Sequence, residues 1–492
     1  MEWTEEGLAA EHLELGRAVA AWIAEYARTL DGRSVSSPAT PAELRELFNE
    51  PLPEKGVGRE AILDEFARRI AVHAMHIPSP RYYGLFNPTP LPIAVWADAL
   101  CSALNQNGAA WRNSPSASLV EDRVLHWLCE LIGYGELAYG TLTSGGSEAN
   151  LVALKCARDN AHQSIRGRGV RSGDAELVVY VSELAHYSLD KSVDILGLGR
   201  ENLRSIRTDE AHHIDLGSLV QEIEKDKHEG RRPCCLVGVA GATSNGAIDP
   251  LDELARVARE YKLWFHVDAA YGGALAFSAA HKHLLRGIEL ADSVTIDPHK
   301  WMFVPFACGA VLLREGGAML RNSFDVTPEY LSEKREGGAD VPYDFFRYGQ
   351  LGTRRFNALK CWMAIKFLGV VGYAEIIERQ IELTRYFAAR LRDTPFFELV
   401  GGVETAVCCF RWRPPKLNET DAAALDECQH RLQQRVEKSG EAWISTTVLK
   451  KRRVLRVNVN SILTSRRHLD DLLELLRRES ELLLEEQGVG AG

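Results

Sequence analysis

The chain contains 492 residues, of which 46% are hydrophobic and 26% are charged, a composition that is ordinary for soluble globular proteins. This excludes a fibrous, low-complexity or mainly disordered chain, and at roughly 150 residues per domain the length predicts about three domains. The 58 basic and 68 acidic residues give a net charge of -10. Nucleic-acid binding is therefore disfavoured as the main function, because it needs clustered positive charge.

The ten cysteines are scattered and form no CxxC pair, so neither a zinc ribbon nor another metal site is expected. Their density in so long a chain is typical of reduced, mostly buried thiols and predicts a cytoplasmic protein. The first residues have neither the basic start nor the apolar run of a secretory signal. The longest apolar run, residues 301–313, is too short to span a bilayer, so no membrane partner is expected.

The first 88 residues are predicted to form a helical arm. Apolar residues recur at roughly helical spacing over 8–26 and again over 61–76. Several prolines then interrupt the pattern between residues 78 and 92. The first domain boundary is therefore expected near residue 88.

Residues 89–370 alternate helical patterns with short apolar runs at 177–181, 234–240, 263–267 and 293–296. Strands that alternate with helices predict an α/β fold with a mainly parallel sheet covered by helices on both faces. Ligands bind such sheets at the carboxyl ends of the strands. Polar residues directly after these runs are therefore the first candidates for a site.

Residues 371–492 mix helical and strand patterns and predict a smaller α+β domain. Glycines at 369–372 favour a hinge before it. The elements expected after the hinge are a long helix at 373–394, strands at 405–412 and 454–459, and a closing helix at 469–484.

Residues 143–150 read TSGGSEAN and lead into an apolar helical pattern. Two glycines let the backbone approach a ligand, and a helix start offers unpaired N–H groups and the positive end of a dipole, which together make a phosphate cradle. An ordinary helix N-cap after a glycine turn is the alternative. The segment is neither a Walker A motif nor a GxGxxG dinucleotide fingerprint.

Two charged residues follow predicted strands. Asp268 comes directly after the run 263–267, where a carboxylate is costly unless it meets a positive partner; a capping or turn Asp is the alternative. Lys300 follows the run 293–296, and an amine in a partly apolar site can form a Schiff base; a Lys that reaches the surface is the alternative. With the phosphate cradle, both residues match the needs of pyridoxal 5'-phosphate, which are a phosphate cup, a carboxylate for the pyridine nitrogen and a lysine for the aldehyde.

The chain resembles the group II pyridoxal-phosphate-dependent decarboxylases, the family of aromatic-L-amino-acid, histidine and glutamate decarboxylases. The resemblance covers nearly the whole chain from residue 79 onward, and it depends on motifs in family order at 79–83, 143–151, 185–188, 267–272, 297–301 and 351–356. It implies fold type I, the aspartate-aminotransferase-like fold. It also implies pyridoxal 5'-phosphate as cofactor and a homodimer whose active site is shared across the interface.

The resemblance assigns roles to individual residues. Lys300 would be the Schiff-base lysine, and Asp268 would pair with the pyridine nitrogen. Ala270 would lie under the ring, and His186 would stack on its open face. Asp297 stands where the aromatic branch tends to carry Asn, and because a carboxylate repels phosphate, a contact through backbone or water is expected instead. The cofactor-binding set implied by the resemblance is Gly146, Ser147, His186, Thr243, Asp268, Ala270, Ser293, Asp297, His299 and Lys300.

Tyr330 follows Lys300 by 30 positions and matches the catalytic-loop Tyr of the family. The segment 330–340 is rich in glycine and charge, which suits a flexible lid. After loss of CO2, Tyr330 is expected to return a proton to Cα, with His299 facing the substrate. A loop-anchoring aromatic is the alternative. Catalysis is thus expected from Lys300, Tyr330, His186 and His299.

Arg456 lies in the apolar run 454–459, where an arginine needs an anion, and it aligns with the family's arginine near the substrate carboxylate. The resemblance places the side-chain pocket partly in the partner subunit. The expected substrate-binding residues are Tyr83, Phe86, Thr89, Trp111 and Arg456, with Tyr82 as a further candidate.

Aromatic residues in this set favour an aromatic amino acid as substrate, although core packing is the alternative for each of them. Arg112 keeps a glutamate-like or other polar substrate open. Aldehyde synthesis is less expected, because the family links it to loss of the loop Tyr or the stacking His, and Tyr330 and His186 are both present. An aminotransferase on the same fold and a non-catalytic chain that only binds the cofactor are more distant alternatives.

Overall fold

The computed structural model describes residues 4–173, 175–326, 344–415, 417 and 421–486. The chain divides into two compact units. One consists of Met1–Leu85, Ala389–Glu398 and Phe410–Gly492, and the other of Phe86–Ala388 and Leu399–Cys409. The three-part division with boundaries near residues 88 and 370 stays a prediction.

The larger unit is built on a seven-stranded sheet with the strand order β2-β8-β7-β6-β5-β3-β4. Neighbours from β4 to β7 are parallel, and β8 is antiparallel to both β7 and β2. The predicted mainly parallel α/β fold is therefore confirmed. The strands are β2 Tyr139–Thr143, β3 Leu177–Ser182, β4 Leu203–Ile206, β5 Arg232–Val239, β6 Trp264–Asp268, β7 Ser293–Ile296 and β8 Gly309–Leu313.

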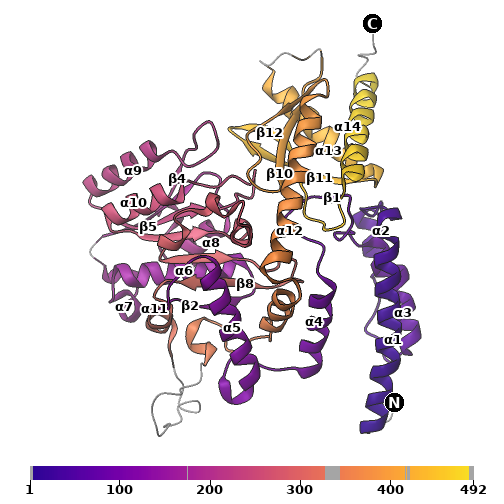
Figure 1. Ribbon diagram of the computed structural model, residues 1–492, viewed down its shortest axis with the longest axis horizontal. Coiled ribbons are helices and arrows are strands. Elements are labelled where there is room, and N and C mark those ends of the chain that lie inside the picture. The colour runs from indigo at the N-terminus through magenta and orange to yellow at the C-terminus, as the bar shows by residue number, and fades with distance from the viewer. Residues whose placement is uncertain (1–3, 174, 327–343, 416, 418–420, 487–492) are drawn as a thin grey trace. The chain divides into compact units, whose positions relative to one another are not determined.

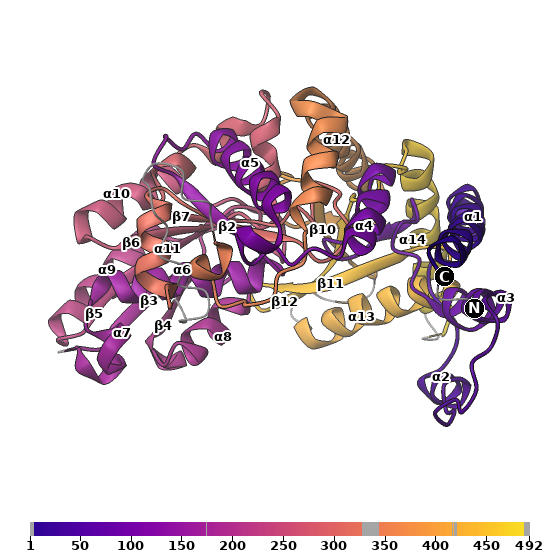
Figure 2. The same cartoon turned by 90° about the horizontal axis from the view of Figure 1, so that it is seen from below.

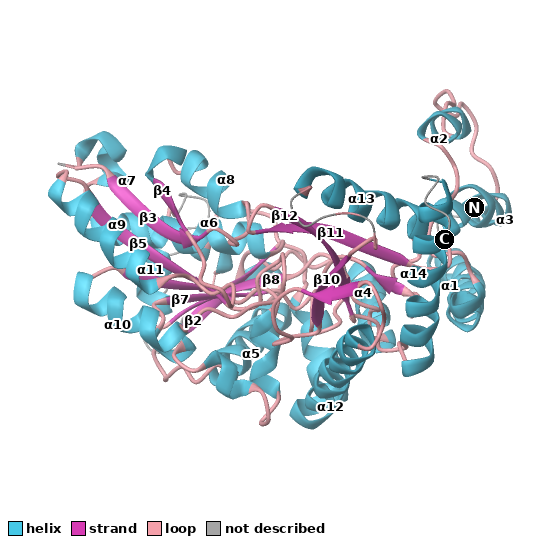
Figure 3. Ribbon diagram, turned by 90° about the horizontal axis from the view of Figure 1, so that it is seen from above, coloured by secondary structure: helices cyan, strands magenta, loops and turns pink. Residues whose placement is uncertain are grey.

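Helices cover both faces of this sheet. In Figures 2 and 3, α6 and α8 lie on one side of the strands and α5 and α10 on the other. Gly369, with a φ of +62°, interrupts the longest helix, α12. The helices are α4 Pro92–Leu104, α5 Pro115–Leu131, α6 Gly146–Ala161, α7 Ile165–Arg168, α8 Ser188–Ile195, α9 Leu216–His228, α10 Leu251–Tyr261, α11 Gly316–Phe324 and α12 Ala358–Arg392.

Strands β3, β6 and β7 are buried along their whole length. Helices on both faces remove every side chain of such strands from water, so β3 is an almost continuous apolar run, whereas β7 keeps two small polar residues, Ser293 and Thr295. The runs therefore end where the sheet ends. This places Asp268, the last residue of β6, and Asp297, the residue after β7, at the same edge.

A second sheet has five strands in the order β1-β11-β12-β10-β9. Its strands are β1 Tyr82–Tyr83, β9 Phe397–Leu399, β10 Val407–Trp412, β11 Trp443–Leu449 and β12 Arg452–Asn458. Helix α13, Ala422–Ser439, packs on β11 and β12 and against α14, Arg466–Glu486 (Figure 1).

The N-terminal segment contains α1 Glu5–Thr29, α2 Pro41–Leu47 and α3 Arg59–Glu65. Trp22 of α1 packs edge-on against Phe66, with ring centroids 5.0 Å apart. The helix predicted over 61–76 is helical as far as His73, but its type changes along the chain: α3 ends at Glu65 and is followed by a π-helix, Phe66–Ile70, and a short 3-10 helix, Ala71–His73. No helix among the described residues is long and apolar enough to cross a membrane.

A buried ion pair between Arg354 and Glu121 supports the sheet edge at β2. The two side chains are 7% and 5% exposed. Arg354 also donates to the carbonyl oxygen of Leu142 at 2.9 Å and to Thr141 Oγ1 at 3.1 Å, and Glu121 accepts from the Leu142 N–H at 3.1 Å. The pair thus fixes β2, the strand that leads directly into the glycine turn of the TSGG motif.

We expect Arg354→Leu to lower the free energy of unfolding by about 3–5 kcal/mol, because it leaves Glu121 buried without its cation. The matched control is Arg355→Ala, since the pair between Arg355 and Asp98 is 47% and 31% exposed and should contribute about 0–1 kcal/mol. Urea-induced unfolding of both variants measures the difference. If both variants lost the same free energy of unfolding, the buried pair would contribute no more to stability than the exposed one.

Candidate functional site

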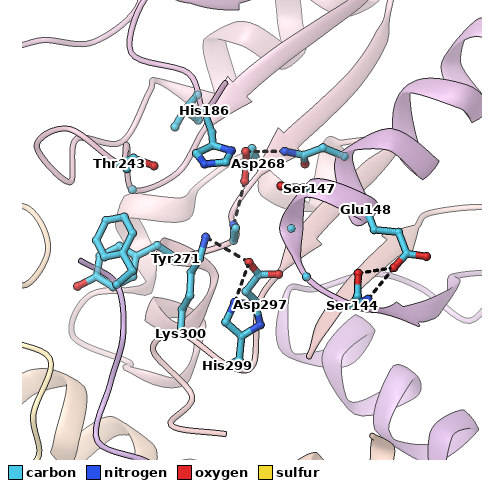
Figure 4. Close-up of a pocket in the computed structure, with 17 residues that line it drawn as sticks. Ser144, Ser147, Glu148, His186, Thr243, Asp268, Tyr271, Asp297, His299 and Lys300 are labelled. Atoms are coloured by element: carbon cyan, nitrogen blue, oxygen red, sulfur yellow. Dashed lines mark hydrogen bonds and ion pairs between the residues drawn. The ribbon is translucent and has the colours of Figure 1, made fainter. Parts of the chain in front are cut away.

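A cavity of about 280 Å³ lies at the carboxyl ends of β5, β6 and β7 in the larger unit (Figure 4). Its position agrees with the rule for ligands on parallel sheets. The residues predicted from the sequence that line it are Phe86, Gly146, Ser147, His186, Thr243, Asp268, Ala270, Asp297, His299 and Lys300.

The Asp268 carboxylate reaches this cavity from the end of β6 and is 7% exposed. Its Oδ2 accepts a hydrogen bond from Asn150 Nδ2 at 2.8 Å, and its Oδ1 accepts one from the Ala270 N–H at 3.2 Å. Hydrogen bonds offset part of the free-energy cost of burying a charged carboxylate, and a nearby cation offsets the rest. The carboxylate therefore fits a positively charged ring nitrogen in the cavity.

Lys300 points into the same cavity (Figure 4). Its Nζ lies 3.2 Å from Asp297 Oδ2, and the Lys300 side chain is only 20% exposed. The other oxygen of that carboxylate, Asp297 Oδ1, is buried and has no hydrogen-bond partner among the described residues. The pairing of Asp297 with Lys300 was not predicted from the sequence.

The glycine turn of the TSGG motif gives a ligand close access to the backbone. A Cβ at Gly146 would lie 2.8 Å from Asp297 Oδ2, and one at Gly145 would lie 3.1 Å from His299 Cε1, so side chains here would fill the cavity. Helix α6 begins at Gly146, and the N–H groups of its first turn have no partner inside the helix. The turn therefore fits a phosphate, and with Asp268 and Lys300 it fits all three functional groups of pyridoxal phosphate.

Two histidines face the cavity in neutral form. Burial lowers the pKa of His186 and also that of His299 from the ordinary value of 6.5. His186 Nδ1 accepts from the Ser188 N–H at 3.2 Å, which leaves its ring proton on Nε2. His299 Nδ1 lies 2.6 Å from the Cys308 carbonyl oxygen, and its Nε2 lies 3.7 Å from Asp297 Oδ2.

An aromatic stack forms one wall of the cavity. The rings of Phe86 and Tyr271 are stacked with centroids 3.8 Å apart, and Tyr271 stacks on Trp301 at 4.6 Å. Phe86 and Tyr271 line the cavity, as does Thr243 from the loop after β5. Sequence reasoning missed Tyr271 as a site residue, although it stands inside the quoted motif at 267–272.

Three predicted residues of the larger unit lie outside the lining. Ser293 begins β7, at the opposite end from Asp297, and its hydroxyl contacts Trp264 Nε1 at 2.8 Å and His266 Nδ1 at 2.9 Å. The expected direct cofactor contact of Ser293 is therefore replaced by hydrogen bonds inside the sheet. Thr89 is buried, and the Trp111 backbone N–H donates to Asp344 Oδ1 at 3.0 Å.

Two further substrate-binding candidates belong to the smaller unit. Tyr83 is fully buried, and its hydroxyl donates to the His468 carbonyl oxygen at 2.9 Å. Arg456 is 2% exposed and donates through Nη1 to the Gly84 carbonyl oxygen at 2.8 Å. Tyr330 and the predicted lid lie outside the described residues.

Asn150 is the main site residue that sequence reasoning missed. It lines the cavity, is 1% exposed and contacts Asp268 directly. The available signal was a polar residue at the end of the TSGGSEAN motif, in the middle of an apolar helical pattern. A buried amide needs partners for its donors and acceptors, so a polar residue at this position indicates that other polar groups face it.

The proteins that this chain resembles are consistent with a site for pyridoxal phosphate. Residues 41–413 match the model of the pyridoxal-dependent decarboxylase conserved domain. The chain is 32% identical over 472 residues to an aromatic-L-amino-acid decarboxylase of Bacillus atrophaeus, which covers 95% of both chains. It is 32% identical over 381 residues to an acidic amino acid decarboxylase of Xenopus tropicalis, which covers 77% of this chain and 74% of the relative.

Among solved structures, the crystal structure of Oryza sativa TDC with PLP and tryptamine superimposes with a TM-score of 0.91 at 27% sequence identity, covering 98% of this chain and 99% of that chain. The predicted fold, cofactor and family are therefore confirmed. The chain belongs to the pyridoxal-dependent decarboxylase family and is a pyridoxal-phosphate-dependent amino-acid decarboxylase.

Proposed function

We propose that the protein converts an aromatic L-amino acid to the corresponding amine and CO2. The observation that supports this most directly is the presence of Lys300 and Asp268 in one cavity whose wall is the aromatic pair Phe86 and Tyr271. Aromatic faces favour a flat apolar side chain. The similarity to an aromatic-L-amino-acid decarboxylase supports the same choice.

Pyridoxal phosphate, when bound, supplies the electron sink for the charge that remains on Cα when CO2 leaves. Lys300 is the residue that would hold its aldehyde carbon, and the first turn of α6 would hold its phosphate. Asp268 would hold the ring nitrogen, with Ala270 beneath the ring and His186 on the other face. Ser147 and Thr243 line the cavity and complete the set.

The contact between Asp297 and Lys300 places a carboxylate oxygen beside the lysine amine, with Asp297 Oδ2 3.2 Å from Nζ. A carboxylate at this position repels further negative charge in the cavity, such as that of a phosphate oxygen. We therefore propose that Asp297 pairs with Lys300 and binds no phosphate oxygen.

A homodimer is proposed as the working form. Helix α1 extends over 25 residues and buries none of them, while Leu8 and Leu13 are 48% and 53% exposed. A helix with an uncovered apolar face needs a partner, and a second copy of the chain would cover it. In such a dimer Tyr83, Thr89, Trp111 and Arg456 stay candidates for a shared substrate pocket, and Tyr330 stays the candidate proton donor.

The cytoplasm is proposed as the compartment. All ten cysteines are buried and form no disulfide. Oxidising compartments favour disulfides between cysteines, so a chain whose thiols are all reduced fits a reducing compartment.

A product assay tests the substrate. We expect aromatic amino acids to release CO2 and an equal amount of amine, and Lys300→Ala to abolish turnover and to prevent borohydride from fixing the cofactor to the protein. Lys366→Ala, which changes a lysine exposed on α12, is the control and should behave as wild type. Preference for glutamate would support the alternative acidic substrate, for which Arg112 is the candidate, and release of aldehyde in place of amine would support an aldehyde synthase.

The two histidines predict a pH profile. Because burial lowers the pKa of His186 and His299 below 6.5, both stay neutral from pH 7 down to about 6.5 and gain protons only at lower pH. We expect the decarboxylation rate to hold constant above pH 6.5 and to fall below it, with the acid limb altered in His186→Gln. An inflection above pH 6.5 that disappears in this variant would contradict a lowered pKa.

A further inference from the structure

Asn150 uses its whole hydrogen-bonding capacity inside the larger unit. Its Nδ2 donates to Asp268 Oδ2 at 2.8 Å and to Ser188 Oγ at 3.0 Å. Its Oδ1 accepts from Thr295 Oγ1 at 2.8 Å and lies 3.1 Å from His266 Nε2. A side-chain amide offers two donors and two lone pairs, so every one of them is engaged by a buried partner.

The direction of these bonds follows from the carboxylate. Ionised Asp268 can only accept hydrogen bonds, so the amide nitrogen of Asn150 must face it and the amide oxygen must face His266. Burial lowers the pKa of His266 to about 4, so its ring carries one proton, and that proton must sit on Nε2. Nδ1 of His266 then accepts from Ser293 Oγ at 2.9 Å, and Ser293 accepts from Trp264 Nε1 at 2.8 Å. Nδ1 also lies 3.2 Å from the Ser293 carbonyl oxygen, but a proton on Nδ1 would leave Nε2 and the Asn150 amide oxygen facing each other as two acceptors. In this series of hydrogen bonds, from Trp264 through Ser293, His266 and Asn150, each donor thus points toward Asp268.

A second branch leads from the same amide to His186. Because Ser188 Oγ accepts from Asn150, its own hydroxyl proton is available for His186 Nδ1, which lies 2.8 Å away. Two donors, the Ser188 hydroxyl and the Ser188 N–H, therefore meet His186 Nδ1. This arrangement fixes the ring proton of His186 on Nε2. Figure 4 shows His186 and Asp268 close together at the same side of the cavity.

We propose that Asn150 is a positioning residue that orients Asp268 and His186 together, so that one amide sets both the carboxylate that would meet the ring nitrogen and the tautomer of His186. A carboxylate that accepts a hydrogen bond is a weaker base, so a proton shared with the ring nitrogen stays on the nitrogen. Thr295 and His266 act through Asn150 by holding its amide in the required orientation. The inference rests on the proposed role of Asp268 toward the cofactor ring.

The test compares cofactor binding in three variants. Asn150→Leu removes the amide at nearly constant volume, and Thr295→Val removes one of the two donors that orient it. Loss of a hydrogen bond to a charged group changes an equilibrium by about 10- to 100-fold, so we expect Asn150→Leu to bind pyridoxal phosphate about that much more weakly and Thr295→Val to show a smaller change of the same sign. Asn160→Leu changes an exposed Asn on the same helix, α6, and should bind as wild type.

The pH titration of the visible absorption of the bound cofactor is the second readout. We expect this titration to shift in Asn150→Leu and Thr295→Val, and kcat to fall more than KM rises. A residue that only supports folding would lower the thermal midpoint and leave the titration unchanged. That outcome would overturn the inference, and Thr295→Val keeps it testable if Asn150→Leu fails to fold.

Asp268→Asn is measured beside these variants to separate the two claims. If Asp268→Asn binds and titrates as wild type, the proposed role of Asp268 is wrong. If Asp268→Asn is defective while Asn150→Leu and Thr295→Val match wild type, the role of Asp268 stands and only the positioning by Asn150 is wrong.

Discussion

The site depends on the cost of keeping one carboxylate charged inside the protein. Asp268 is 7% exposed, and such a group stays ionised only where donors and a cation surround it. Asn150 and the Ala270 N–H supply the donors, and the cavity supplies space for the cation. This arrangement fits a positively charged ring nitrogen in the cavity, as proposed.

The fold delivers the other groups to that carboxylate through sheet geometry. Parallel strands end at the same edge, so Asp268 after β6 and Lys300 after β7 meet although 32 positions separate them. The glycine turn after β2 comes to the same edge, and the buried pair of Arg354 and Glu121 holds β2 in place. The buried pair therefore also positions the glycine turn that fits a phosphate.

Much of this site could be predicted because short, mainly apolar or β-branched runs mark strands that are buried on both faces. The run 293–296 is β7 itself, and the residues after such runs line the cavity. Ser293 shows the limit: the family resemblance placed it at the cofactor, but it begins β7, and the strand direction alone assigns its side chain to the far end. Strand β8, Gly309–Leu313, was not predicted, because it forms only the last part of the longer apolar run 301–313.

The network around Asn150 could not be predicted for a different reason. Asn150 lies on α6, and its partners come from β6, β7 and the start of α8, so the contacts exist only after the sheet and helices have packed. The contact of Lys300 with Asp297 is instead local, because the two residues lie three positions apart in the turn after β7. Spacing in a sequence identifies residue types that suit a chemistry, whereas the protonation state of each group depends on partners that tertiary packing supplies.

The most direct test of an ionised, positioned Asp268 is the protonation state of the ring nitrogen of bound pyridoxal phosphate. Magnetic resonance of protein loaded with cofactor that is isotope-labelled at this nitrogen measures it. The nitrogen should be protonated in the wild-type protein at neutral pH and should lose that proton in Asp268→Asn. An unprotonated nitrogen in the wild-type protein would show that the buried carboxylate does not act on the ring and would contradict the account.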